Sequence, residues 1–263
     1  MIRILFLGDI VGEPGRKAVI DTIPKLKNEL GLDFIIVNGE NAAAGRGITA
    51  RIAIDLLRCG IAVITSGDHI WDQRETAAYI ETEPRLLRPL NYPTGTPGAG
   101  SIILETNKAK VAVMNVQCRT FTNPPLENPF LTAQAEAQRL REETPVIFVD
   151  VHGETTSEKI AMGYHLDGSV SAVVGTHTHV QTADERILEN GTAFLCDAGM
   201  CGPDDSILGR EPKSVLHRFL TSMPSRLPIG KFPVRLCGSI IDIDENTGRA
   251  QSIQRLQRLY PET

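Results

Sequence analysis

The apolar positions of this chain fall into short runs separated by longer amphipathic stretches. The runs at 2–7, 34–37 and 61–65 have the length and residue types of buried strands. Each run is followed, after a short polar loop, by a stretch whose apolar residues recur every three or four positions, which is typical of a helix that covers a sheet. The pattern therefore predicts three consecutive strand–helix units in the first third of the chain.

Residue types at the ends of the amphipathic stretches mark the predicted helices. The first helix begins near Pro14 and ends before Gly31, and Pro24 within it predicts a kink. Thr49 is a typical N-cap for the second helix, which Gly60 ends. A third helix is predicted over 73–80.

The rest of the chain mixes hairpins with further strand–helix units. The other predicted elements are a hairpin at 101–117, a helix at 131–142, a strand at 146–151 followed by a helix, a strand at 170–174, a hairpin turning at Asn190-Gly191, a helix at 212–220 and a hairpin turning at 245–248. This order predicts an α/β fold in which helices cover sheets of mixed parallel and antiparallel strands. Polar strand-end motifs lie on both sides of the Pro-rich stretch at 89–98, so we expect a single domain over 1–263.

The composition is that of a globular protein. Hydrophobic residues make up 41% of the 263 positions and charged residues 22%, and no run approaches the roughly 18 apolar residues of a membrane span. The first apolar run is too short for a signal peptide, so we expect a cytoplasmic protein. Five cysteines without a CxxC pair predict buried free thiols rather than a disulfide framework or a zinc ribbon.

The charge balance limits the partners of the chain. Lys and Arg number 27 against 32 Asp and Glu, which gives a net charge of −5. This balance provides no electrostatic footprint for stable binding to long nucleic acids. A small phosphorylated substrate, such as a nucleotide, is compatible with it if a metal supplies local positive charge.

Metal-ligating side chains follow the ends of the predicted strands. They are Asp9, Glu40 with Asn41, Asp68 with His69, His152, and His177 with His179. In α/β folds, ligands bind at the carboxyl ends of strands, and two histidines one residue apart in an extended segment point to the same face. Carboxylates, imidazoles and an amide suit iron, manganese, zinc or nickel. About seven ligands are too many for one ion, and they fit two ions about 3.5–4 Å apart that share a carboxylate.

The ordered motifs resemble those of one enzyme family. They are GD at 8–9, NGEN at 38–41, GDHIWD at 67–72, DVHGE at 150–154 and GTHTH at 175–179. Together they resemble the calcineurin-like metallophosphoesterases, and specifically the YmdB-type family of bacterial 2′,3′-cyclic-nucleotide phosphodiesterases, across nearly the whole chain. The resemblance implies a four-layer α/β/β/α sandwich of two mixed sheets flanked by helices. It also implies two divalent or mixed-valence metal ions, with iron first and manganese, zinc or nickel as alternatives.

The resemblance assigns a role to each of these side chains. It places Asp9, Asn41 and His179 on one metal and Asp68, His152 and His177 on the other. It makes Glu40 the bridge between the metals, and a hydroxide that bridges them becomes the nucleophile on a 2′,3′-cyclic nucleotide. His69 becomes the general acid, and an imidazole beside a metal ligand can protonate a leaving alkoxide near neutral pH.

Asp68 departs from the family pattern, which has asparagine in a GNH motif at this place. A carboxylate adds a negative charge, which makes the site less electrophilic, and we hypothesise an altered metal preference or rate. We also expect the Asp68 carboxylate to pair with His69 and to raise its pKa.

Several alternatives stay open. Arg46, in a loop that lacks the GK[ST] of a P-loop, is a candidate for contact with the substrate phosphate, and Cys118 and Cys196 have little to support them as nucleophiles. The same site would serve a phosphomonoesterase or another cyclic-nucleotide phosphodiesterase, and a weakened site would serve a regulatory protein that binds nucleotide or RNA. The physiological substrate, the native metal and the oligomeric state, including a homo-oligomer, are left open.

Overall fold

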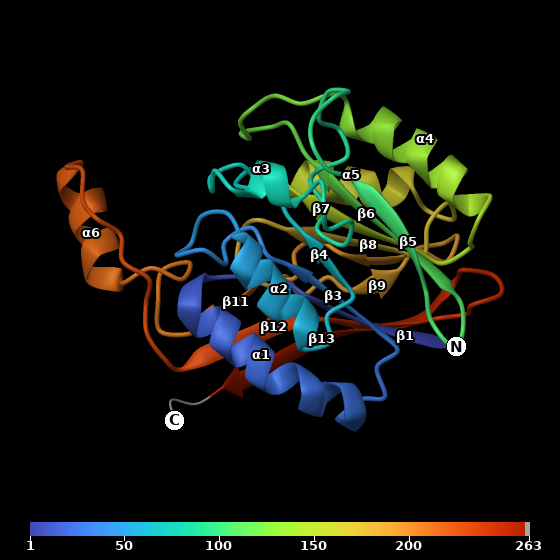
Figure 1. Ribbon diagram of the computed structural model, residues 1–263, viewed down its shortest axis with the longest axis horizontal. Helices are drawn as coiled ribbons and strands as arrows, with labels where there is room; N and C mark the ends of the chain where they lie inside the picture. Colours follow the sequence, from blue (N-terminus) through green and yellow to red (C-terminus); the bar gives the residue numbers. More distant parts are fainter. Residues whose placement is uncertain (261–263) are drawn as a thin grey trace.

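The computed structural model describes residues 1–260, which form two mixed sheets stacked face to face with helices on both outer sides. Figure 1 shows α1 and α2 beneath one sheet and α4 and α5 above the other. This is the four-layer α/β/β/α sandwich that the family resemblance implied.

In the described part of the chain, the first sheet contains seven strands. They are β1 (Ile2–Leu7), β2 (Asp9–Ile10), β3 (Phe34–Asn38), β4 (Val63–Thr65), β11 (Met200–Pro203), β12 (Val234–Ile243) and β13 (Ala250–Tyr260). β1, β3 and β4 pair in parallel, so their carboxyl ends lie at one edge. β12 pairs antiparallel with β1 and with β13, and the predicted hairpin at 245–248 is confirmed. The outer face is covered by α1 (Gly12–Glu29) and α2 (Ala50–Arg58).

Six strands form the second sheet within residues 1–260. They are β5 (Ser101–Glu105), β6 (Lys110–Gln117), β7 (Ile147–His152), β8 (Ala172–Thr176), β9 (Arg186–Ile187) and β10 (Ala193–Leu195). β6, β7, β8 and β10 are parallel, and the predicted hairpins join β5 to β6 and β9 to β10. Its outer face is covered by α4 (Pro129–Arg141) and α5 (Thr156–His165).

An apolar core between the sheets brings the carboxyl ends of both together. In β1, Ile4 and Phe6 face the second sheet while Leu5 and Leu7 face the helices, which explains why this strand is apolar on both faces. The ring of Phe6 meets that of Phe148 with centroids 4.9 Å apart. Because side chains alternate along a strand, the residues two and four positions after Phe148 in β7 also point toward the first sheet. They are Asp150 and His152.

Some predicted boundaries are wrong. α3 (Thr76–Tyr79) is shorter than predicted, because residues 67–75 form successive turns instead of a helix. The short strands β2 and β11 were not predicted, because a strand of two to four residues is too short to show an alternation of apolar and polar side chains. The predicted end of the first helix before Gly31 is confirmed, because α1 continues past Pro24 to Glu29.

Three further sequence-based expectations can be compared with the structure. α6 (Pro212–Thr221) lies where it was predicted and projects away from both sheets (Figure 1). All five cysteines are free thiols, and all except the half-buried Cys59 are buried. None of the helices within residues 1–260 is both long and apolar enough to cross a membrane.

Candidate metal centre

Four side chains from the carboxyl ends of both sheets converge on one point. Glu40, Asp68, His152 and His177 each offer one ligand atom, and these atoms lie within 4.8 Å of one another. Glu40 and Asp68 follow strands of the first sheet, whereas His152 and His177 end or follow strands of the second. The cluster therefore exists only because the two sheets are stacked with these edges together.

The contacts within this cluster aim imidazole nitrogens at carboxylate oxygens. His152 Nε2 lies 3.2 Å from Glu40 Oε2 and 3.1 Å from Asp68 Oδ1. His177 Nδ1 lies 2.9 Å from the same nitrogen of His152. A Cβ on Gly67 would collide with Glu40 Oε2, so only glycine lets the chain pass this closely. Nitrogen and oxygen donors in this arrangement fit a transition-metal ion.

A second group of donors lies on the other side of Glu40. Asn41 Nδ2 donates to Glu40 Oε1 at 2.8 Å and lies 3.3 Å from His179 Nε2, which is 3.9 Å from Asp9 Oδ1. Within residues 1–260, Asp9 Oδ1 is buried and has no hydrogen-bond partner. A buried carboxylate oxygen left without a partner costs free energy, so this atom fits a cation ligand. Glu40 thus presents one oxygen to each group.

The amide of Asn41 turns its nitrogen toward this second group. A metal would be bound by the oxygen, Oδ1, which needs a half-turn of the amide about its last side-chain bond.

Burial and neighbouring charges shift the pKa values of these groups. Burial raises the pKa of Asp9, and the nearby histidines offset this only in part. Burial also acts to raise the pKa values of Glu40 and Asp68, but the interactions with the neighbouring histidines, His152 first, together outweigh it and both lie below their usual values. Burial acts to lower the pKa of His152, but the carboxylates of Glu40, Asp68 and Asp9 together outweigh it and the pKa lies above its usual value. The cluster therefore holds excess negative charge that bound cations would neutralise.

A buried hydrogen-bond chain fixes the orientation of His152. Thr176 Oγ1 donates its proton to Asp150 Oδ1 at 2.7 Å. The same hydroxyl oxygen therefore accepts a hydrogen bond from His152 Nδ1 at 2.9 Å. With the proton of His152 on Nδ1, the lone pair of Nε2 faces the cluster. Asn38 Nδ2 also donates to Asp150, at 3.0 Å. Burial raises the pKa of Asp150 to about 6. Asp150 belongs to one of the sequence motifs, but no role was predicted for it, although a polar residue inside a buried strand is a usable signal.

The expectation that His177 and His179 share the face of an extended segment is wrong. β8 ends at Thr176, and His177 and His179 have φ values of +99° and +65°, in the left-handed region that non-glycine residues rarely adopt. Their side chains reach opposite sides of Glu40 through this turn. Strained backbone of this kind persists only where the surroundings hold it in place.

A buried ion pair holds this strained turn. Lys159 Nζ donates to Asp197 Oδ2 at 2.7 Å and to the carbonyl oxygen of Thr176 at 3.2 Å, and both side chains of the ion pair are about 1% exposed. Asp197 Oδ2 also accepts from the backbone nitrogen of Thr178 at 3.1 Å and from its hydroxyl at 2.7 Å. Neither Lys159 nor Asp197 was identified from the sequence.

The expected pairing of Asp68 with His69 is also wrong. Asp68 Oδ1 lies against His152 and His177, whereas His69 Nδ1 lies 3.1 Å from Asp72 Oδ2. The turn that brings Asp72 next to His69 is closed by a backbone hydrogen bond from Asp72 N to His69 O, at 3.0 Å.

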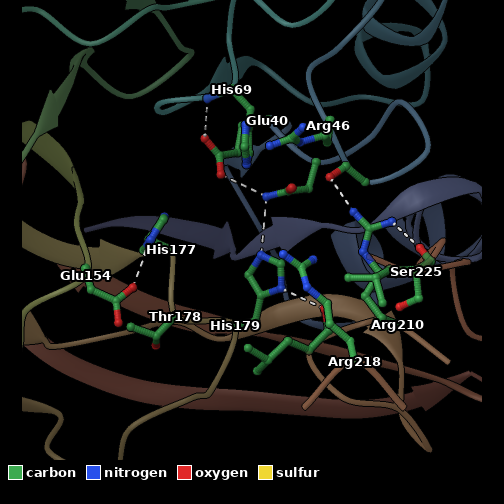
Figure 2. A pocket seen from close by; sticks show the side chains of 14 residues that line it. Glu40, Arg46, His69, Glu154, His177, Thr178, His179, Arg210, Arg218 and Ser225 are labelled. Carbon is green, nitrogen blue, oxygen red and sulfur yellow. Dashed lines mark hydrogen bonds and ion pairs between the residues drawn. The ribbon is translucent and has the colours of Figure 1, made fainter. Parts of the chain in front are cut away.

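The centre opens onto a cavity of about 690 Å³. Its lining residues are Glu40, Asn41, Gly45, Arg46, His69, Glu154, His177, Thr178, His179, Leu208, Arg210, Arg218, Ser225 and Leu227. Arg46, the sequence-based candidate for contact with phosphate, is thus at the cavity. Figure 2 shows His177 and Glu154 on one side and Arg46 and Arg210 on the other. Glu154 Oε2 lies 3.0 Å from His177 Nε2. No role was predicted from the sequence for Glu154, Arg210 or Arg218.

The histidines and cysteines for which the sequence supported no role also lie outside the cavity. His165 and His217 are exposed, and His165 Nε2 contacts the carbonyl oxygen of Phe130. Burial raises the pKa of Cys118 to about 12 and that of Cys196 to about 11, so both are protonated thiols at neutral pH. Neither lines the cavity, which argues against a cysteine nucleophile.

Comparisons with known proteins agree over almost the whole chain. Residues 5–256 match the family model described as YmdB-like protein. The 2′,3′-cyclic-nucleotide 2′-phosphodiesterase of Bacillus subtilis (strain 168) is 48% identical over 255 residues, which cover 97% of this chain and 96% of that protein.

Two solved structures are similar to this chain in both fold and sequence. A hypothetical protein from Thermus thermophilus has a TM-score of 0.92 and 38% identity, covering 99% of this chain and 100% of the other. A phosphatase from Mycoplasma pneumoniae has a TM-score of 0.93 and 33% identity, covering 99% of this chain and 94% of the other.

Proposed function

The chain belongs to the YmdB-like protein family, and from this premise we propose that it hydrolyses 2′,3′-cyclic nucleotides to nucleoside monophosphates. The family predicted from the motifs is confirmed. The protein is a metal-dependent phosphoesterase with a calcineurin-like fold. The printed name of the Bacillus subtilis relative supports the choice of substrate. We further propose that residues 1–263 act as one domain and that the protein is cytoplasmic.

We propose a dinuclear centre, and the position of Glu40 is the observation that carries it. One carboxylate oxygen of Glu40 faces His152 and the other faces Asn41, as a bridging ligand requires. The proposed ligands are Asp9, Asn41 and His179 for one ion and Asp68, His152 and His177 for the other. When bound, the ions would lower the pKa of a water so that it can act as nucleophile and would neutralise charge on the phosphoryl oxygens. Iron is the proposed metal, with manganese, zinc or nickel as alternatives.

His69 is the proposed general acid, and its position next to Asp72 supports this. In its protonated form His69 donates Nδ1–H to Asp72 and presents Nε2–H for transfer. As water oxygen bonds to phosphorus, the bond from phosphorus to one ribose oxygen breaks, and that oxygen takes the proton from His69 Nε2. The product is a nucleoside monophosphate with one free ribose hydroxyl.

Asp68 is proposed to change the metal preference or rate of this centre. Its carboxylate adds negative charge beside His152 and His177, where an asparagine would add none. A comparison of Asp68→Asn with the parent protein tests this. Identical metal content, rate and pH profile in the two proteins would contradict it.

Monoester hydrolysis is the second candidate function, because the similar Mycoplasma pneumoniae protein is described as a phosphatase. Purified protein of known metal content should be assayed on a 2′,3′-cyclic nucleotide, on bis-p-nitrophenyl phosphate and on a nucleoside monophosphate. The proposed function predicts metal-dependent hydrolysis of the two diesters and loss of it in Asp9→Ala and in His69→Ala. Preference for the monoester would favour the second candidate. Absence of any metal-dependent turnover would favour a regulatory binding protein.

A further inference from the structure

Three arginines gather at the part of the cavity away from His177 and Glu154 (Figure 2). Arg46 comes from the loop after β3, Arg210 lies between β11 and α6, and Arg218 lies in the last turn of α6. Segments far apart in the sequence thus place cationic groups on one cavity.

Few carboxylates lie near these arginines to compensate their positive charge. Within residues 1–260, neither Arg210 nor Arg218 has a carboxylate within ion-pair distance, and Arg46 approaches only Asp72, with 3.4 Å between Nε and Oδ2. Arg210 is half-buried, and its pKa is lowered by burial first and then by the positive charge of Arg46. The positive charges of Arg46 and Arg210, which are close enough to affect one another, attract an anion from solution into the cavity that Arg218 also lines.

Arg210 fixes the geometry of this cationic group. Its guanidinium donates to the carbonyl oxygen of Gly45 at 2.9 Å and to that of Leu227 at 3.0 Å. A Cβ on Gly45 would collide with Arg210 Nη2, and Gly45 has a φ of +84°, so glycine is required for this contact. Arg210 thereby ties the loop that carries Arg46 to the chain that follows α6. The side chains of Arg46 and Arg218 are exposed and available to a ligand.

We propose that Arg46 and Arg218 bind a second phosphate of the substrate, on the 5′ oxygen of the ribose whose cyclic phosphate is hydrolysed. This inference rests on the proposed function, which places the 2′ and 3′ oxygens at the metal centre and leaves the 5′ oxygen at the far end of the ribose. Metal ions held by the proposed ligands would neutralise the charge of the reacting phosphate, which would leave the arginines for another anion. The substrate class is then a 5′-phosphorylated cyclic nucleotide or a short RNA ending in a 2′,3′-cyclic phosphate.

The chemistry of such ends identifies the reaction that supplies them. A 2′,3′-cyclic phosphate forms when a ribose 2′ oxygen attacks the adjacent phosphodiester and the 5′ oxygen of the next nucleotide leaves with a proton. RNA cleavage by this transesterification therefore produces the proposed substrate. A few arginines on one cavity of a chain with a net charge of −5 suit a short fragment better than a long nucleic acid.

The test compares adenosine 2′,3′-cyclic phosphate with its 5′-phosphorylated form in the metal-loaded enzyme. We expect wild type to prefer the 5′-phosphorylated substrate by about tenfold in kcat/KM, as one or two charge-assisted hydrogen bonds provide. Arg218→Ala should remove most of this preference and leave kcat/KM for the simple cyclic nucleotide within about twofold, while Arg218→Lys should keep part of the preference. Arg218 is the better probe because Arg46 also contacts Asp72.

Arg226→Ala is the matched control, since Arg226 is an exposed arginine in the chain that follows α6 and does not line the cavity. It should keep the preference of wild type. Equal loss on both substrates in Arg218→Ala, no preference in wild type, or the same loss in Arg226→Ala would overturn the subsite. Absence of hydrolysis of both substrates by wild type would instead overturn the proposed function.

Discussion

Replacing Asp197 by alanine tests how the strained turn at His177 and His179 is held. Among residues 1–260, the substitution leaves the buried ammonium of Lys159 with only the carbonyl oxygen of Thr176 as a partner. It also removes the acceptor for the backbone nitrogen and the hydroxyl of Thr178. We therefore expect loss of stability together with loss of activity.

The magnitude follows from the burial of the pair. Breaking a buried ion pair by removing one partner costs about 3–5 kcal/mol. At roughly 2–4 °C per kcal/mol for a chain of this size, the melting temperature should fall by roughly 6–20 °C. Glu29→Ala, which breaks the exposed pair of Glu29 with Arg258, should cost no more than about 1 kcal/mol and serves as the control.

Scanning calorimetry and a phosphodiesterase assay separate the two effects. The double variant Lys159→Met with Asp197→Ala removes the unpaired charge, so it should recover much of the stability. It does not restore the hydrogen bonds to Thr178, so its kcat should stay well below that of wild type. A melting temperature within about 2 °C of wild type in Asp197→Ala, or full activity in the double variant, would refute this account of the turn.

Three further substitutions test other contacts of the centre. Thr176→Val breaks the link between Asp150 and His152 and should weaken metal binding about 10–100-fold in a competition with chelators, whereas Thr176→Ser should bind as wild type does. Asp72→Asn removes the carboxylate that holds His69 through Nδ1, so kcat should fall, and an unchanged kcat would contradict the role of Asp72. The pKa of Asp150 rises from its usual 3.8 to about 6 on folding, so the folded state binds the proton more tightly and stability falls as pH rises from about 4 to about 6. In urea unfolding of the metal-free proteins, the free energy of unfolding of wild type should fall by about 3 kcal/mol over this pH range, and that of Asp150→Asn should lack this fall. An equal fall in wild type and in Asp150→Asn would show that Asp150 is not its source.

Much of the architecture was predictable because strand ends carry a strong sequence signal. The run at 2–7 is apolar because both of its faces are buried, and Glu40 and Asp68 follow strands of the same kind. Parallel strands place their carboxyl ends at one edge, so their convergence could be expected before the structure was known.

The details of the site depend on contacts between distant segments and on the closure of single turns, which local patterns do not encode. The turn at His177 is held by Lys159 and Asp197, and neither residue forms part of a motif. The pairing of His69 with Asp72 depends on the closure of one turn, and a neighbour in sequence was the wrong partner to expect. Arg210 and Arg218 reach the cavity through the path of the chain around α6, which no periodicity predicts.

The most direct test of the central claim is the number and position of metal ions in crystals of the protein loaded with manganese or iron. Anomalous scattering should locate two ions about 3.5–4 Å apart, with Glu40 between them, Asp9 on one and His152 on the other. A single ion, or two ions that Glu40 does not bridge, would contradict the dinuclear centre proposed here.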